Sequence, residues 1–326
     1  MKTPISLIID DSAPLVQVYY KHIEPPFTQD GRPILENIPN DFLFRFCDTV
    51  EKYGIRGKFS VVPNPGCYGN ICESVGGFSR EVLREWIDTV NSRLSGYFSF
   101  CPEILTHHLT LDLKTGKYLS ETEREWSVHA TEEEMTDYIA YALEIDRDAG
   151  IRCTGVTSPW DFGVHNEKNY VLGVAGAFDR VFGQKKSWYF LHEIVGEKNI
   201  RPWVEYDEGG RTVVSIPYTV GDGFWQSIDR DDDSDEYVRF IADGYISEDG
   251  KSGTIVKALD DGCFPILCTH WQSMFSNGNR VGVRALGEVA KRIENTLSDR
   301  VEWVDFDRQA ELAIADGIKR PAFQIR

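Results

Sequence analysis

Apolar runs of strand length alternate with segments of helical period along nearly the whole chain, and this alternation limits the possible folds more than any other feature. The apolar runs at residues 5–9 and 57–63 each precede an amphipathic segment, at 41–54 and 79–94. Strands joined by helical connections lie parallel in one sheet. Seven or eight such units predict one α/β domain spanning residues 1–326, a distorted (β/α) barrel of about seven parallel strands. An open doubly wound sheet is the alternative architecture.

Capping signals set the ends of several predicted helices. Thr131 is followed three residues later by Glu134, the spacing of a capping box, and the helix predicted there ends at Gly150. Ser79 is placed to cap an earlier helix, and a long amphipathic helix is predicted over 281–297. Further strands are predicted at 98–108, 152–159, 180–182, 187–192, 212–217, 264–270 and 301–306.

The charge balance narrows the range of partners. The chain carries 35 Lys and Arg against 52 Asp and Glu, a net charge of −17. Nucleic acids and anionic membrane surfaces are bound through clustered basic residues, so we expect neither as a partner. A carbohydrate or a small amide substrate fits such a chain, and a homo-oligomer is compatible with it.

Cysteine usage and the N-terminal segment predict a cytoplasmic protein. The seven cysteines are scattered without a CxxC pair, so we expect them to be reduced and structural. The N-terminal "MKTPISLIIDD" lacks the long apolar stretch and cleavage site of a secretory signal. No run reaches the roughly 18–20 apolar residues of a membrane span. A cytoplasmic location follows, unless an export signal has been removed from the chain.

Polar side chains of catalytic type follow several predicted strands. The pair Asp10-Asp11 follows the first strand, "EILTHHLTLD" at 103–112 ends the third, and His270 ends a late one. A further strand ends in "TSPWDFG" at 157–163. Each of these residues alone is as well explained by a turn or a structural contact. The carboxyl ends of barrel strands share one face, however, so together they predict a pocket there.

Five segments, in order, resemble motifs of the polysaccharide deacetylase superfamily, a family of metal-dependent carbohydrate esterases and amidases. The Asp-Asp pair in "IIDDS" matches the first motif, and "GIRGKFSVV" is similar to the G-x-x-[AG]-T-F-F strand. "EILTHHLTLD" is similar to the E-I-G-x-H-x-x-x-H segment, "TSPWDFG" to the R-x-P-x-G loop, and "PILCTH" to the late L-x-H strand. The resemblance covers residues 5–305, nearly the whole chain.

The resemblance implies roles for individual residues. Asp10 would be the general base and Asp11 a ligand of a divalent metal, with His107 as a second ligand. His270 would be the general acid that protonates the leaving amine. The metal would compensate one carboxylate of the pair and leave the other free to act as a base. Zinc suits mixed histidine and carboxylate ligation best.

The chain departs from the family pattern at two positions. Leu111 stands four residues beyond His107, where the family has a second histidine. A register shifted by one residue gives His108 and Asp112 as alternative ligands. Adjacent strand residues point in opposite directions, so His107 and His108 are not expected to serve together. Thr157 stands where the family has an arginine that tunes the base.

The resemblance predicts a deacetylase or related amide hydrolase that acts on an N-acylated sugar or a small cyclic amide. A carbohydrate-binding barrel that has lost the chemistry is one alternative, suggested by Leu111 and Thr157. A metal-free glycoside hydrolase, with Asp10 and an acidic partner such as Asp161, is another. The expected substrate-binding residues are Pro159, Trp160, Asp161 and Trp271.

Overall fold

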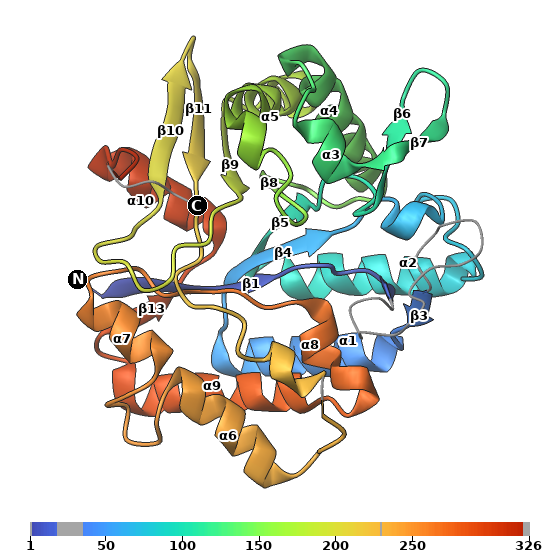
Figure 1. The fold of residues 1–326 in the computed structure, drawn as a ribbon. Coiled ribbons are helices and arrows are strands. Elements are labelled where there is room, and N and C mark those ends of the chain that lie inside the picture. The colour runs from blue at the N-terminus through green and yellow to red at the C-terminus, as the bar shows by residue number, and fades with distance from the viewer. Residues whose placement is uncertain (1, 18–34, 229, 322–326) are drawn as a thin grey trace.

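The computed structural model describes residues 2–17, 35–228 and 230–321. Within these residues the protein is a mixed α/β fold with a parallel sheet and ten α-helices (Figure 1). The predicted α/β class is therefore confirmed. Among these residues, no helix combines the length and the apolar character that crossing a bilayer requires.

The first strand, β1 (Thr3–Ile9), lies in the middle of the main parallel sheet. β4 (Gly57–Val61) pairs with one side of β1, and β5 (Phe98–Pro102) extends the sheet beyond β4. β12 (Ile266–Leu267) pairs with the other side of β1, and β13 (Val301–Trp303) pairs with the first residues of β1. The carboxyl end of β1 therefore lies between strand ends from both halves of the chain.

A second sheet contains β8 (Gly155–Thr157), β9 (Lys186–Phe190) and β11 (Arg211–Ser215), all parallel. β10 (Trp203–Glu208) is antiparallel to β11. Isolated parallel bridges join the two sheets. Phe100–Cys153 and Glu103–Thr157 connect the β5 and β8 segments, and Val220–Leu267 connects the chain after β11 to β12.

The helices with clear capping signals form where they are predicted. Thr131 and Glu134 form both hydrogen bonds of the capping box of α4 (Glu132–Asp148). The Ser79 side chain accepts a hydrogen bond at the start of α2, and α9 spans Val281–Leu297. The helices and strands not described elsewhere are β2 (Leu15–Gln17), β3 (Leu35–Asn37), α1 (Asn40–Tyr53), α2 (Arg80–Thr89), α6 (Asp235–Tyr245), α7 (Thr254–Asp260), α8 (Trp271–Phe275) and α10 (Phe306–Asp316).

One predicted strand is wrong. Residues 180–182 are the last turn of α5 (Glu167–Phe182). Glycines lower the helical propensity of this segment, which hides the helix in the sequence. Packing provides the reason for them, because a Cβ at Gly173 would lie 2.6 Å from the Cβ of Met135 in α4. The close contact between α4 and α5 stabilises a helix that the local sequence does not predict.

The predicted strand at 98–108 is shorter than expected. β5 ends at Pro102, and the chain continues through a loop into a hairpin of β6 (Leu109–Asp112) and β7 (Lys117–Thr122). The short helix α3 (Glu123–Ser127) follows the hairpin directly. The histidine segment of the third strand is thus a loop between two strands.

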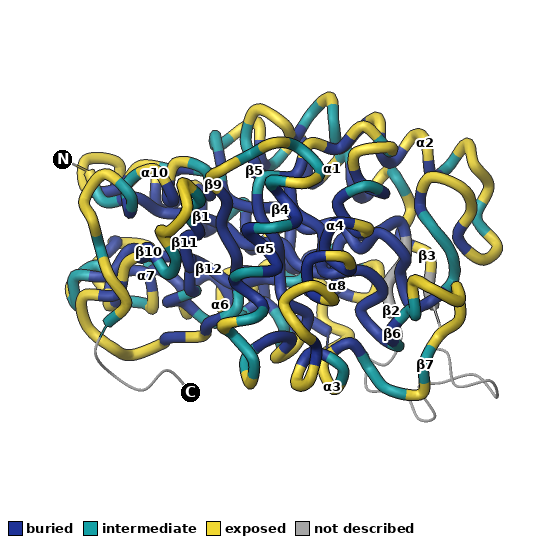
Figure 2. Tube along the Cα trace, turned by 90° about the horizontal axis from the view of Figure 1, so that it is seen from above, coloured by how far each residue is buried: buried dark blue, intermediate teal, exposed yellow. Residues whose placement is uncertain are grey.

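The core surrounds the strands of the main sheet. Six of the seven residues of β1 are buried, as expected for a strand covered on both faces. In Figure 2 the buried part of the chain runs through the middle of the molecule, and exposed residues line its border. The seven cysteines are free thiols, as predicted, and all except Cys72 are buried.

Candidate functional site

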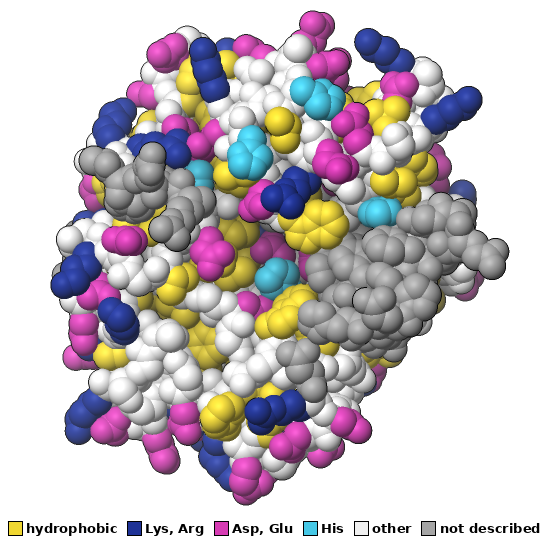
Figure 3. All heavy atoms as spheres, in the orientation of Figure 1, with side chains coloured by type: hydrophobic (Ala, Val, Ile, Leu, Met, Phe, Trp, Pro, Cys, Tyr) yellow, Lys and Arg dark blue, Asp and Glu magenta, His cyan; other side chains and the backbone are white. Residues whose placement is uncertain are grey.

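A cavity of about 650 Å³ lies at the carboxyl ends of the strands. In Figure 3, histidine, acidic and hydrophobic side chains gather around a hollow near the middle of the face shown. The predicted pocket is therefore present, and it joins residues that are far apart in the sequence. Its lining residues are Asp10, Asp11, Glu103, His107, Arg124, Ser158, Trp160, Asp161, Phe190, Leu191, Glu193, Tyr218, Cys268 and His270.

Asp10 is paired with a buried lysine. Lys58 Nζ donates hydrogen bonds to Asp10 Oδ1 and to Thr157 Oγ1, and lies 4.8 Å from the centroid of the Phe190 ring. Burial raises the pKa of Asp10, and the charge of Lys58 opposes that shift. Burial would lower the pKa of Lys58, but Asp10 outweighs it and the pKa is raised. Lys58 is thus a cation at the base of the cavity.

Asp11 turns its carboxylate into the same cavity. Its backbone is left-handed, with φ of 60°, a conformation that Asp adopts more readily than most residues. Its N–H donates to Glu103 Oε2 at 2.7 Å, and Gln272 Nε2 donates to its Oδ2 at 2.8 Å. The turn lets two successive carboxylates line one cavity, which an extended strand would not allow.

Asp11, Glu103 and His107 form a compact buried cluster. One ligand atom from each lies within 4.8 Å of the others. His107 Nε2 is 2.9 Å from Asp11 Oδ1 and 3.4 Å from Glu103 Oε1. The three residues come from the ends of β1 and β5 and from the loop after β5, so the sheet itself brings them together.

Charge is unevenly shared within this cluster. Burial raises the pKa of Glu103 well above its usual range, and the charges of Asp11 and Asp10 add to the shift. Burial acts on Asp11 in the same direction, but the nearby His107 outweighs it and holds the pKa of Asp11 below its usual range. Burial would lower the pKa of His107, yet Asp11 raises it. A proton on His107 therefore compensates Asp11 in the protein alone.

The donor atoms of the cluster fit a divalent cation. Asp11 Oδ1 is buried, and a protonated His107, with Nε2 at 2.9 Å, is the cation beside it in the protein alone. A buried carboxylate needs such a compensating charge, and a divalent cation bound between Asp11 and His107 would supply it in place of the His107 proton. Carboxylate oxygens and an imidazole nitrogen are all ligand atoms that zinc takes in proteins.

A buried carboxylate holds the backbone of the His107 loop. His107 has φ of 55°, in the left-handed region that non-glycine residues rarely adopt. Glu123 accepts hydrogen bonds from the N–H groups of Thr106 and His107, both at 2.8 Å, and from the Tyr138 hydroxyl at 2.9 Å. Burial raises the pKa of Glu123 to about 7, although these donors oppose the shift. Glu123 thus stabilises the unusual backbone that presents His107.

His270 lines the cavity next to Asp10, with which it forms an isolated parallel bridge. Its Nδ1 is 2.8 Å from Asp222 Oδ2, and the Trp225 ring lies 4.9 Å away between centroids. Burial would lower the pKa of His270, but the hydrogen bond and charge of Asp222 raise it to about 9. At neutral pH the His270 side chain is therefore the positively charged imidazolium.

Two predicted substrate residues line the cavity. The Trp160 side chain is 45% exposed, and its ring centroid lies 5.1 Å from that of His107. Asp161 forms an ion pair with Arg124 at 2.8 Å. Pro159 is buried next to them, and its carbonyl accepts a hydrogen bond from the Phe162 N–H at 3.0 Å. Pro159 therefore shapes the turn that presents Trp160.

Three residues that the sequence predicts for the site do not line the cavity. Trp271 is fully buried among Phe42, Phe46 and Phe59, so core packing replaces its expected substrate contact. Asp112 lies in the β6–β7 hairpin, where its carboxylate accepts hydrogen bonds in the turn. His108 is buried outside the cavity lining. Of the two registers, the one with His107 is the one that faces the cavity.

Sequence reasoning missed Lys58, Glu103, Asp222 and Gln272. A lysine within the apolar run "GKFSVV" is a signal for a buried charge, and Glu103 lies within the quoted "EILTHHLTLD" segment. Asp222 follows the β11 strand by seven residues, in a loop with no periodic pattern. Nothing in the local sequence connects it with His270.

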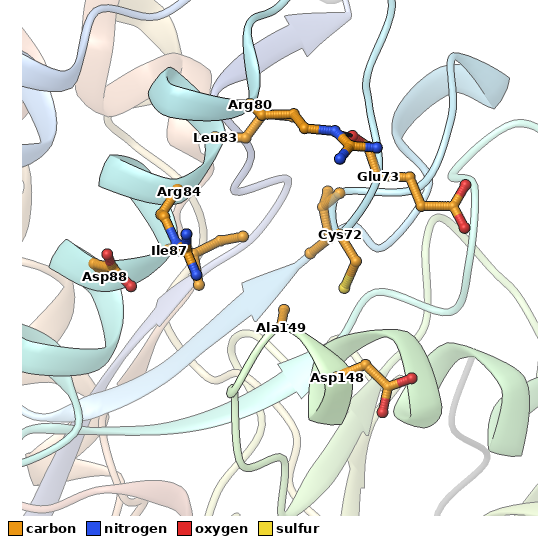
Figure 4. A pocket seen from close by; sticks show the side chains of 10 residues that line it. Cys72, Glu73, Arg80, Leu83, Arg84, Ile87, Asp88, Asp148 and Ala149 are labelled. Carbon is orange, nitrogen blue, oxygen red and sulfur yellow. Dashed lines mark hydrogen bonds between the residues drawn. The ribbon is translucent and has the colours of Figure 1, made fainter.

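A second cavity, of about 330 Å³, contains none of the predicted residues. Figure 4 shows that it lies between α2, which contributes Arg80, Arg84 and Asp88, and the end of α4, next to Asp148. Its lining has the mixed charges of an ordinary surface groove. Comparison with known proteins adds no candidate function, because no family model matches the chain and no curated protein matches it significantly.

Proposed function

We propose that this protein is a metal-dependent hydrolase that removes the acyl group from an N-acylated sugar, or cleaves a related amide, in the manner of the polysaccharide deacetylase superfamily. The observation that carries the proposal is the convergence of Asp11, Glu103 and His107 on one point beside Asp10 and His270. A metal-ligand cluster flanked by a potential base and a protonated imidazole is what amide hydrolysis requires.

We propose that the fold is a seven-stranded barrel of the deacetylase type. The parallel bridges between the β5 and β8 segments and between Val220 and Leu267 support closure, because they connect the two sheets at two separate borders. Chemistry at the carboxyl ends of the strands is typical of such barrels. The seven free thiols favour a reducing, cytoplasmic compartment.

Asp11, Glu103 and His107 would hold the metal, and their mixed carboxylate and imidazole donors suit zinc. When bound, a divalent metal polarises the amide carbonyl and lowers the pKa of a water molecule. Glu103 would take the place that Leu111 leaves open in the family pattern. Glu123 would fix the His107 backbone, and Gln272 would orient the Asp11 carboxylate.

Asp10 and His270 would move the protons. Asp10 would accept the proton of the attacking water, and Lys58 would hold the carboxylate in place through Oδ1. Lys58 would thereby supply the cation that the family takes from the arginine position, where Thr157 stands and hydrogen-bonds to Lys58. His270, oriented by Asp222, would protonate the leaving nitrogen. Burial favours this use of Asp10, because a raised pKa makes a carboxylate a better base.

The cavity mouth offers contacts suited to a sugar. Trp160 presents an exposed aromatic face on which an apolar sugar face could stack. The Arg124–Asp161 pair supplies hydrogen-bond donors and acceptors for hydroxyl groups. Its exposure and its pairing with Arg124 make Asp161 a binding residue in this proposal rather than an acid catalyst.

The first test is the metal content of the purified protein, with Asp11→Ala, Glu103→Gln and His107→Ala variants beside it. We expect about one divalent ion per chain in the wild type and its loss in all three variants. His108→Ala is the matched control and should retain the ion. A screen of N-acetylated sugars should then show hydrolysis that a chelator abolishes. A wild type that binds no divalent ion after reconstitution would overturn the proposal.

A further inference from the structure

A second set of potential metal ligands lies in the same cavity. Asp10, Cys268 and His270 each offer one ligand atom, and these atoms lie within 4.8 Å of one another. Asp10 and Cys268 are buried, and the His270 side chain is 29% exposed. None of the three belongs to the Asp11–Glu103–His107 cluster, so the two sets share no ligand.

The surroundings orient these residues for ligation. Asp222 binds His270 Nδ1, which leaves Nε2 as the ring nitrogen for a ligand, and a carboxylate behind a histidine is the usual support of a zinc ligand. Lys58 engages Asp10 through Oδ1, so Oδ2 is the oxygen left for a cation. The Cys268 thiol makes no hydrogen bond with the described residues and lines the cavity.

The donor types of this set differ from those of the first cluster. A thiolate and an imidazole with one carboxylate select a thiophilic divalent cation of the zinc class. The first cluster has two carboxylates and no sulfur. A metal that binds Cys268 can therefore be distinguished from one bound at Asp11 by the sulfur alone.

We propose that Asp10, Cys268 and His270 form a second, inhibitory position for a thiophilic divalent cation such as Zn²⁺. A cation there displaces the Cys268 and His270 protons and engages the oxygen of Asp10. The inhibitory part rests on the proposed function, because it requires that Asp10 and His270 are the base and the acid. The binding part depends only on the geometry of the three ligands.

The positive charge of Lys58 opposes a cation near Asp10. Three carboxylates near this set, Asp11, Asp222 and Glu193, act on the pKa of Asp10, His270 or Cys268. The cavity is therefore acidic on balance, which favours a bound cation. Because Lys58 lies next to Asp10, the second position should be weaker than the first. Inhibition should consequently appear only above one equivalent of metal.

The binding test is a titration of the metal-free full chain with Co²⁺, followed by absorption. Thiolate ligation to Co²⁺ produces a sulfur-to-metal charge-transfer band in the near ultraviolet, which oxygen and nitrogen ligands do not. We expect this band to grow with the second equivalent, after the first has bound. Cys268→Ser should remove the band and weaken the second equivalent more than about 100-fold, since loss of even an outer-shell partner costs 10–100-fold.

Cys72→Ser is the matched control, because Cys72 is the exposed cysteine and should not affect the band. Retention of the first equivalent in Cys268→Ser shows that the variant is folded. A wild type without the band at saturation, or a band that persists in Cys268→Ser, overturns the second position. A band without binding at Asp11 refutes the proposed function and supports the second position.

The inhibition test compares hydrolysis at one and at several equivalents of Zn²⁺. Wild type should lose activity as the excess rises, whereas the activity that Cys268→Ser shows at one equivalent should resist the excess. Equal inhibition of both proteins overturns the inhibitory role. That outcome leaves the hydrolase proposal intact, because activity at one equivalent tests it separately.

Discussion

Lys58 carries a buried charge whose partner is the proposed base. Removing one member of a buried ion pair leaves the other uncompensated and typically costs about 3–5 kcal/mol. Lys58→Met should therefore lower the free energy of unfolding by about that amount at neutral pH, measured by urea denaturation. The double variant Lys58→Met/Asp10→Asn should recover much of the loss, since it removes both charges. Additive losses in the double variant would show that Lys58 stabilises the fold independently of Asp10.

Asp222 controls the protonation of His270. The wild-type imidazole has a pKa of about 9 because Asp222 outweighs the effect of burial. Asp222→Asn removes the negative charge, so burial dominates and the pKa of His270 should fall. An NMR titration of the His270 ring measures the shift, and any hydrolytic activity should lose its alkaline side at lower pH than in the wild type. Asp161→Asn, at the exposed ion pair with Arg124, is the control and should leave the His270 titration unchanged.

The residues that sequence reasoning placed in the site are those at strand ends. Asp10, Asp11 and His270 directly follow or end apolar runs, so the parallel order of the strands predicts that they meet, whereas His107 reaches the cavity from the loop after β5. Lys58 and Asp222 were not predicted, because only tertiary contacts bring them to their partners. Lys58 and Asp10 are 48 residues apart in the sequence, and so are Asp222 and His270. Trp271 was misplaced because an aromatic residue next to a strand end fits the core as well as a binding site.

At the scale of elements, the best-predicted helices are those whose ends carry capping residues in the local sequence. The capping box of α4 is an example, with Thr131 Oγ1 accepting from the Glu134 N–H. Thr131→Ala should lower the free energy of unfolding by about 1 kcal/mol, because an N-cap hydrogen bond is lost. Thermal or urea unfolding measures the loss, and Thr131→Ser should be close to wild type. An alanine variant as stable as the wild type would mean that the cap is redundant with packing.

Elements without such signals depend on their neighbours. α5 contains Gly173 and Gly176, which weaken its intrinsic helicity but allow it to approach α4 closely. The segment after β5 has an apolar composition, yet its backbone turns at Ile104 and His107 with positive φ. Neither feature follows from periodicity, because each reflects a contact with a distant part of the chain.

At the scale of the whole molecule, metal binding should couple the separate strand ends. A cation that binds only the folded chain stabilises it by RT ln(1 + [L]/Kd), about 2.7 kcal/mol at a hundredfold excess over Kd. Zn²⁺ should therefore raise the melting temperature of the wild type clearly more than that of Asp11→Ala/His107→Ala, which keeps only the weaker second position. Differential scanning calorimetry with and without a chelator measures the effect. Equal stabilisation of the double variant would place the responsible cation elsewhere.

The position of β1 has a consequence for how the protein is made. β1 leaves the ribosome well before its partners β12 and β13, whose residues follow more than 250 positions later, as in the pairing of Ser6 with Ile266. During synthesis the nascent chain therefore carries an apolar strand with an unpaired edge until β12 has emerged. Such an edge is prone to intermolecular pairing. Expression that slows translation near the C-terminus should therefore increase aggregation of the newborn chain.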